Sequence, residues 1–245
     1  MPDQRTHRGP HPEDAESFAP AAHERLRAAV ADYCWLLTRG YAQSSALKIV
    51  GDHFLLTQRQ RTAVMRCSCA DESLSRRREH QVQAPALAGQ PLLIDGYNIL
   101  TTVEAALAGG VILFARDGCY RDMASMHGTF RTVEETVPAL RLTGEFLSAL
   151  EVGHCIWYLD SPVSNSGRLK QAIAGLAEEN RWPWRIELVY SPDAILSAST
   201  EIIATADSII LDRCARWFNL GREIVRARVP GAWVVDLAPD VRESR

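Results

Sequence analysis

The chain has 245 residues, 47% of them apolar, and a formal net charge of −3 at pH 7. This length allows one large domain or two modest ones, and the charge gives no overall sign of nucleic-acid affinity. No apolar run approaches the length of a membrane span and the N-terminus does not resemble a signal peptide, so we expect a cytoplasmic protein without a membrane partner. The six cysteines lack the spacing of a disulfide framework, which predicts reduced thiols.

The first ninety residues predict a tail, a small helical domain and a linker. Residues 1–20 are rich in Pro, His, Asp and Glu, which is typical of a disordered tail. Apolar residues at helical spacing predict an all-helical domain over residues 21–80. Its expected helices cover 21–40, 44–50 and 57–68. Residues 81–90 contain Pro and Gly and lack periodicity, so we place a linker there.

The helical domain carries the one basic cluster of the chain. Six arginines form it: Arg59, Arg61, Arg66, Arg76, Arg77 and Arg78. Such a cluster is either a solvated helix face or a surface that contacts the phosphates of a nucleic acid. The sequence leaves both interpretations open.

From residue 91 onward, apolar strands alternate with helical patterns. The expected strands cover 91–95, 111–115, 155–159, 185–190, 201–204 and 233–237. The main expected helices cover 99–108, 133–150, 166–180 and 208–218. Strands that alternate with helices predict an α/β domain over residues 91–240, with a parallel, doubly wound sheet that the last strand closes.

Three aspartates each follow a separate apolar strand: Asp95, Asp160 and Asp207. Asp117 does so less cleanly. Because the carboxyl ends of parallel strands share one edge of a sheet, we expect these carboxylates to converge. Clustered carboxylates repel one another, and a Mg²⁺ or Mn²⁺ ion between them would relieve that repulsion. The alternative is that each Asp caps the helix that follows it.

Other acidic residues could complete such a site. Glu134 and Glu135 begin the long helix, and Asp212 lies beyond Asp207 as a candidate ligand of a second metal. No Gly-rich phosphate loop follows the first strand, which argues against dinucleotide and P-loop chemistry.

Polar residues near the predicted acidic cluster are candidates for binding substrate. Asn98 follows Asp95 by three residues and could hold a water or phosphate, or cap the helix. Asn165, Arg168 and Lys170 begin the helix after Asp160, where a helix N-terminus with cationic side chains suits an anion. Arg131 stands before the long helix in a similar position. Surface solubility is the alternative role for the three cations.

Several motifs carry a resemblance to a known superfamily. The segments LLIDGYNIL, YLDSPVSNSGRLK and IIATADSIILDRCARWFNLGREIV, followed by WVVDL, resemble the PIN-like nucleases, and the DGYN turn is most similar to their NYN branch. The resemblance covers about residues 91–240. The whole layout also resembles an uncharacterised bacterial and archaeal family with a small helical domain before a PIN-like half containing CYRDMASMHGTFRTVEET.

This resemblance implies a ribonuclease fold that uses Mg²⁺ or Mn²⁺ to activate water against a phosphodiester and leaves a 5′-phosphate. By position, Asp95 matches the acid of the first strand, Asp160 the central acid and Asp207 the late acid. Glu135 matches the helical acid, and Glu134 is equally well placed. The chain departs from the pattern in its loop around Asp117, which is longer than the resemblance predicts.

Three functions follow from these patterns. The first is a metal-dependent endonuclease that acts on RNA, with the basic helical domain guiding the substrate. The second is an inactive PIN-like protein that binds nucleic acid or regulates. The third is a phosphohydrolase with an aspartyl nucleophile, but Tyr97 stands where such enzymes carry a second Asp. The sequence leaves the oligomeric state open, with a homodimer as one option.

Overall fold

The computed structural model describes residues 7–124 and 130–239. Its N-terminal part is helical, and we call residues 14–80 the helical unit. It consists of α1 (Asp14–Ser17), α2 (Pro20–Thr38), α3 (Gln43–His53), α4 (Gln58–Cys67) and α5 (Asp71–His80). The three expected helices correspond to α2, α3 and α4, and Thr57 starts α4 with a capping box. Helix α5 was not expected, because its sequence DESLSRRREH has almost no apolar periodicity.

The main sheet has five parallel strands in the order β5-β4-β1-β6-β7. They are β5 (Trp184–Val189), β4 (His154–Asp160), β1 (Pro91–Asp95), β6 (Ile202–Ala204) and β7 (Arg216–Phe218). The associated helices are α6 (Gly96–Leu107), α7 (Thr136–Ala149), α8 (Ser166–Asn180), α9 (Pro192–Ala198), α10 (Ser208–Leu211) and α11 (Leu220–Arg228). The prediction of an α/β fold with a parallel sheet is therefore confirmed.

Helices cover both faces of this sheet. Successive strand residues point to opposite faces, and those of β1 pack into two different cores. Leu92 and Ile94 pack with residues of α6, α7, α8 and α11, whereas Leu93 packs with residues of α9 and α10. The central strand β1 is thus buried on both sides, and its carboxyl end carries Asp95.

A second, three-stranded sheet has the order β3-β2-β8. Its strands are β2 (Val111–Phe114), β3 (Tyr120–Asp122) and β8 (Trp233–Asp236), with β2 antiparallel to β3 and parallel to β8. The prediction that the last strand closes a single sheet is therefore wrong. An apolar run predicts a buried strand but does not say which strand pairs with it.

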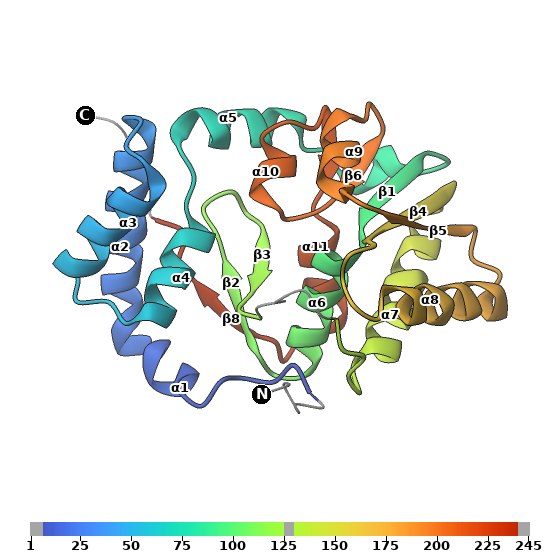
Figure 1. The fold of residues 1–245 in the computed structure, drawn as a ribbon, viewed down its shortest axis with the longest axis horizontal. Coiled ribbons are helices and arrows are strands. Elements are labelled where there is room, and N and C mark those ends of the chain that lie inside the picture. Colours follow the sequence, from blue (N-terminus) through green and yellow to red (C-terminus); the bar gives the residue numbers. More distant parts are fainter. Residues whose placement is uncertain (1–6, 125–129, 240–245) are drawn as a thin grey trace.

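The helical unit packs on this second sheet. Leu26 and Val30 of α2 share a core with Leu113 of β2 and Val235 of β8. Figure 1 shows the second sheet between the helical unit and the main sheet, with α5 running from the helical unit toward α9 and α10. The helical unit therefore shares its core with strands of the predicted α/β domain.

Two other segments differ from the expected organisation. Residues 7–20 belong to the predicted tail, but they include α1, and Phe18 is buried; residues 1–6 lie outside the described part. The predicted linker over 81–90 packs onto the main sheet, because Leu87 lies in its core and Val82 N donates to Trp217 O at 2.8 Å. Single apolar side chains within these segments, Phe18 and Leu87, are buried and account for this packing.

The predicted helix over 208–218 is wrong in its second half. Helix α10 ends at Leu211, and Trp217 lies in strand β7, where it is fully buried. A three-residue strand is too short to show a period of two, so tertiary burial decided its conformation.

None of the helices in the described ranges combines the length and hydropathy that crossing a membrane would require. All six cysteines are buried thiols.

Candidate functional site

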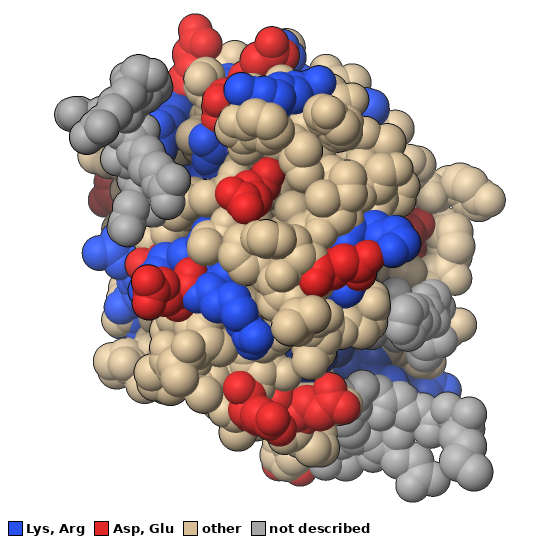
Figure 2. Space-filling view, turned by 90° about the vertical axis from the view of Figure 1, so that its left-hand side faces the viewer, with Lys and Arg blue, Asp and Glu red and all other residues tan. Residues whose placement is uncertain are grey.

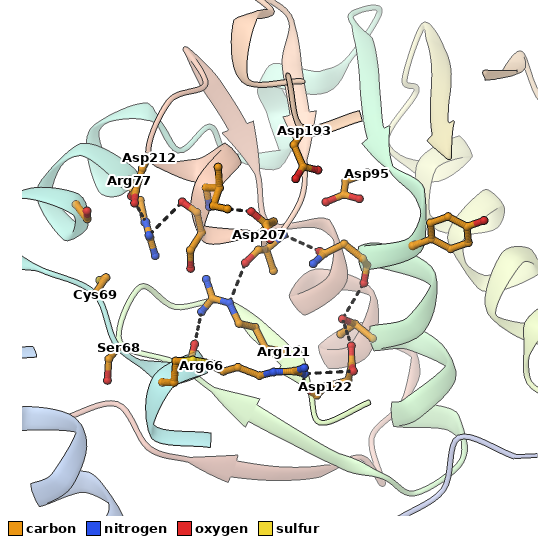
Figure 3. A pocket seen from close by; sticks show the side chains of 18 of the residues that line it. Arg66, Ser68, Cys69, Arg77, Asp95, Arg121, Asp122, Asp193, Asp207 and Asp212 are labelled. Carbon is orange, nitrogen blue, oxygen red and sulfur yellow. Dashed lines mark hydrogen bonds and ion pairs between the residues drawn. The ribbon is translucent and has the colours of Figure 1, made fainter. Parts of the chain in front are cut away.

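Six aspartates line one cavity at the carboxyl end of the main sheet, and four of them end or follow strands of that sheet. Asp95 ends β1, Asp160 ends β4, Asp207 follows β6, and Asp193 lies in the first turn of α9, just after β5. We call these four residues the acidic edge. The cavity has a volume of about 920 Å³, and Figure 3 shows Asp95, Asp193 and Asp207 facing its interior. The three aspartates singled out from the sequence therefore share one cavity, as the topology of a parallel sheet requires.

Asp95 is at the centre of the acidic edge. Thr205 Oγ1 donates a hydrogen bond to its Oδ2 at 2.7 Å. Burial, together with the nearby carboxylates of Asp207 and Asp193, raises the pKa of Asp95 to about 7, although the Thr205 hydrogen bond lowers it. Asp95 occupies the N-cap position of α6, yet its side chain makes no cap hydrogen bond. The capping alternative therefore does not explain this residue.

Asp160 has a buried side-chain oxygen without a hydrogen-bond partner in the described part of the chain. Its Oδ1 is buried and accepts no hydrogen bond from the described residues. Burial raises its pKa. The hydroxyl of Tyr97 is buried without a partner as well, and burial together with the charge of Asp160 raises the pKa of Tyr97 to about 12. Buried polar atoms are normally hydrogen-bonded, so unpaired atoms at a cavity point to a missing ligand or ion.

Asp207 caps a helix and also lines the cavity. Its Oδ1 accepts from the N–H groups of Ile209 at 2.7 Å and Ile210 at 3.3 Å, so it caps α10. Its Oδ2 makes no hydrogen bond among the described residues. Asn98 does not act as a cap; its Oδ1 accepts from Ala206 N at 2.8 Å and so holds the turn before Asp207.

Sequence reasoning missed Asp193. Burial raises its pKa, and the charges of Asp207 and Asp160 add to the effect. Like the other three, it follows a strand of the parallel sheet, with the turn Ser191-Pro192 between. That position after β5 was the signal that could have identified it.

Three of the other predicted acids are engaged elsewhere. Glu135 precedes α7, and its Oε1 lies 2.6 Å from His7 Nδ1; Glu134 lies 3.4 Å from the same imidazole. Asp117 is buried between two arginines away from the main sheet's strand ends. Asp212 does line the cavity, but its Oδ1 accepts from Arg77 Nε at 2.7 Å. Glu135 therefore lies outside this cavity, whereas Asp212, the candidate ligand of a second metal, lines it with its Oδ1 paired to Arg77.

The predicted substrate-binding residues also separate. Asn98 lines the 920 Å³ cavity, whereas Asn165, Arg168 and Lys170 do not. Asn165 donates from Nδ2 to Phe130 O at 3.0 Å, and its backbone adopts the left-handed conformation before α8. Arg131 lines a second cavity of about 290 Å³ near the N-terminal segment. Closeness in sequence to a strand end did not translate into closeness to the cavity for these four.

The residues at the acidic edge fit a metal ion with few protein ligands. Within residues 7–124 and 130–239, no group of three or more His, Cys, Asp or Glu side chains is arranged to hold a metal ion. Mg²⁺ often binds through one or two carboxylates and completes its shell with waters and substrate phosphates. The unpaired Asp160 oxygen and the destabilised charge on Asp95 are what such an ion would satisfy.

The basic cluster of the helical unit is mostly paired inside the protein. The pairs are Arg59–Asp14, Arg61–Asp52, Arg66–Asp122 and Arg77–Asp117. Arg76 and Arg78 remain exposed. Figure 2, which views the molecule from the side of the helical unit, shows basic and acidic side chains interspersed without a continuous basic patch. On this face the structure favours the solvated alternative over a phosphate-binding surface.

Comparisons with known proteins match both parts of the chain. The family "Protein of unknown function (DUF434)" matches residues 25–80, and the family "Domain of unknown function (DUF5616)" matches residues 84–223. The uncharacterized protein MJ0935 of Methanocaldococcus jannaschii is 29% identical over 180 residues, which cover 74% of this chain and 86% of that protein. No solved structure matches. Since the second of these families covers more than half of the chain and contains the acidic edge, the chain belongs to the DUF5616 family.

Proposed function

We propose that this protein is a PIN-like endonuclease that depends on Mg²⁺ or Mn²⁺ and acts on RNA. One observation supports the proposal above the others: four carboxylates from four strand ends line one cavity, and Asp95 among them has a pKa of about 7. Perturbed carboxylates that gather in a cleft are typical of functional sites. The PIN-like resemblance of the motifs around Asp95, Asp160 and Asp207 supplies the reaction class.

Asp95 and Asp160 are the residues that would hold the metal. Both have raised pKa values, so a neighbouring positive charge would favour their ionised forms. A bound Mg²⁺ or Mn²⁺ would supply activation of a water and stabilisation of charge on the phosphodiester. An ion held by two carboxylates would complete its coordination with waters and the phosphates of the substrate.

Asp207 and Asp193 complete the proposed catalytic group. Asp207 lines the cavity and is held there by its Oδ1, which caps α10. Asp193 has a raised pKa because of burial and its acidic neighbours, so it is a better proton acceptor for an attacking water than an ordinary carboxylate. The cavity volume lies within the range of sites for nucleotide-sized ligands.

The test is a Mn²⁺ titration by calorimetry at low ionic strength, followed by cleavage assays on a panel of RNAs. We expect wild type to bind Mn²⁺ and the variant Asp95→Asn/Asp160→Asn to lose binding. Asp95→Asn alone should slow cleavage by at least about 100-fold, the usual cost of removing charge stabilisation. Asp32→Asn on the exposed surface of α2 is the matched control and should behave as wild type.

An empty site that needs substrate phosphates binds metal weakly, so the titration is repeated with a non-cleavable oligonucleotide. A folded wild type that binds no Mn²⁺ under either condition overturns the nuclease proposal.

The second candidate, an inactive PIN-like protein that binds nucleic acid, is favoured by the absence of a three-ligand group within the described ranges. Salt-dependent RNA binding without metal dependence or cleavage would support it.

A further inference from the structure

The segment from Thr205 to Asp212 carries Asp207 but has little secondary structure of its own. It follows the three-residue strand β6 and includes the four-residue helix α10. Its shape is instead held by side chains from other elements. Thr205 Oγ1 donates to Asp95 and accepts from Asp207 N at 2.9 Å. The position of Asp207 therefore depends on contacts made outside the segment.

The backbone N–H and the backbone carbonyl of Ala206 are both held by side chains of other elements. Its N–H donates to Asn98 Oδ1 at 2.8 Å, and its carbonyl accepts from Arg121 Nε at 2.8 Å. Arg121 comes from strand β3 of the second sheet, whereas Asn98 comes from α6. Figure 3 shows the guanidinium group of Arg121 directed toward the turn at Asp207. These two hydrogen bonds anchor the two peptide planes that flank Ala206, and the second of these planes contains the nitrogen of Asp207.

Arg121 belongs to a buried cluster that also includes Asp117 and Arg77. Arg121 Nη1 and Nη2 donate to the two oxygens of Asp117 at 2.9 and 2.6 Å, and Arg77 Nη1 donates to Asp117 Oδ2 at 2.6 Å. Arg77 is 2% exposed and Asp117 is 6% exposed. Although burial opposes its ionisation, the two guanidinium groups hold the pKa of Asp117 well below its usual range. All three groups therefore stay charged at neutral pH.

Arg77 reaches the other end of the same segment. Its Nε donates to Asp212 Oδ1 at 2.7 Å, and its Nη2 donates to Ser208 O at 3.3 Å. Arg77 lies on α5, within the stretch that the DUF434 family matches. The two arginines, joined by Asp117, thus hold the segment at Ala206 and at Ser208–Asp212, and one of them comes from the helical unit.

We infer that Arg77 and Arg121 are positioning residues that place Asp207 at the acidic edge, so that the helical unit completes the site. This inference rests on the proposed function only in treating Asp207 as a site residue. In this view the helical unit helps to form the cavity instead of binding a nucleic acid. It also explains why a buried charge cluster, which is costly to desolvate, lies so near the acidic edge.

The test uses Arg121→Lys and Arg77→Lys, which keep the positive charge beside Asp117 but lose the planar fork that serves two partners at once. Amide hydrogen exchange in the full chain is the primary measurement. We expect exchange at Ala206 and Asp207 to speed up roughly tenfold or more in Arg121→Lys, and exchange at Leu211 and Asp212 to do so in Arg77→Lys. Amides of the central strand β1 should keep their wild-type rates.

Arg141→Lys is the matched control, because Arg141 makes an ion pair with Glu179 on the surface, away from the cavity. It should change none of these rates. Unchanged exchange at residues 206 and 207 in a folded Arg121→Lys protein overturns the inference. A uniform increase over the whole main sheet also overturns it, because that result indicates global destabilisation.

Calorimetry then separates positioning from loss of folded protein. If Asp207 is displaced, we expect the Kd for Mn²⁺ to rise about tenfold in Arg121→Lys with unchanged stoichiometry. A lower stoichiometry at the wild-type Kd contradicts a positioning role. If wild type itself binds no Mn²⁺, the proposed function fails, and the exchange rates alone decide whether the two arginines hold Asp207.

Discussion

Asp95 and Asp117 follow apolar strands in the same way in the sequence, yet their surroundings are opposite. Asp95 ends the central strand of the main sheet among other carboxylates, and its pKa rises to about 7. Asp117 follows β2 of the second sheet between Arg77 and Arg121, and its pKa falls well below its usual range. A carboxylate at a strand end is therefore a candidate site residue where neighbouring strands place further carboxylates beside it. Where the neighbouring elements place arginines beside it, the carboxylate has a structural role.

The largest expected effect comes from breaking the anchored side of the comparison. Asp117→Asn leaves Arg77 and Arg121 with uncompensated buried charge, so we expect the free energy of unfolding to fall by about 3–5 kcal/mol. Urea denaturation at pH 7 measures this loss. A change below about 1 kcal/mol would contradict the view that Asp117 holds the two guanidinium groups together.

The acidic side should respond to pH in the opposite direction. The pKa of Asp95 is higher in the folded protein than in the unfolded chain, where it is about 3.9, so the folded state binds more protons between these values. Without metal, stability should therefore decline as pH rises from about 4 to about 7. Because Asp95→Asn removes this proton linkage, the variant should be more stable than wild type at pH 8 by about 1–3 kcal/mol.

Thermal unfolding at several pH values, with a chelator present, checks this prediction. Asp32→Asn serves as the control, because Asp32 is exposed and no Asp95-like gain at pH 8 is expected from it. If Asp95→Asn loses stability at pH 8, the Asp95 carboxylate contributes to folding and is not strained by its neighbours. Added Mn²⁺ should reduce the gain, since an ion bound to wild type stabilises it by mass action.

The smallest expected effect tests whether the carboxylates influence one another. Asp193→Asn removes a like charge near Asp95, so the pKa of Asp95 should fall by roughly half a unit, as for a single interaction largely screened by water. Carboxyl NMR resonances followed through a pH titration measure it. An unchanged midpoint would show that the charge of Asp193 does not contribute to the raised pKa of Asp95.

Much of the fold was predictable because local patterns determine it. The apolar run before Asp95 predicted a buried parallel strand, and the helical spacing within residues 21–68 predicted α2, α3 and α4. The grouping of Asp95, Asp160 and Asp207 followed from one topological rule, namely that parallel strands end at the same edge. Asp193 obeys the same rule and could have been found with it.

Local sequence patterns thus predicted most of the elements, the parallel sheet and the edge at which carboxylates gather, but they missed α5 and predicted a helix where β7 lies. Only the tertiary structure decided that β2 and β8 form a separate sheet, that Asp117 pairs with arginines, and that Arg77 of the helical unit reaches the segment around Asp207. The difference lies in the sequence separation of the interacting residues. Side-chain periodicity is set by neighbours a few residues apart, whereas strand pairs and ion pairs join residues up to 135 positions apart. No local pattern indicates which distant group will neutralise a buried charge.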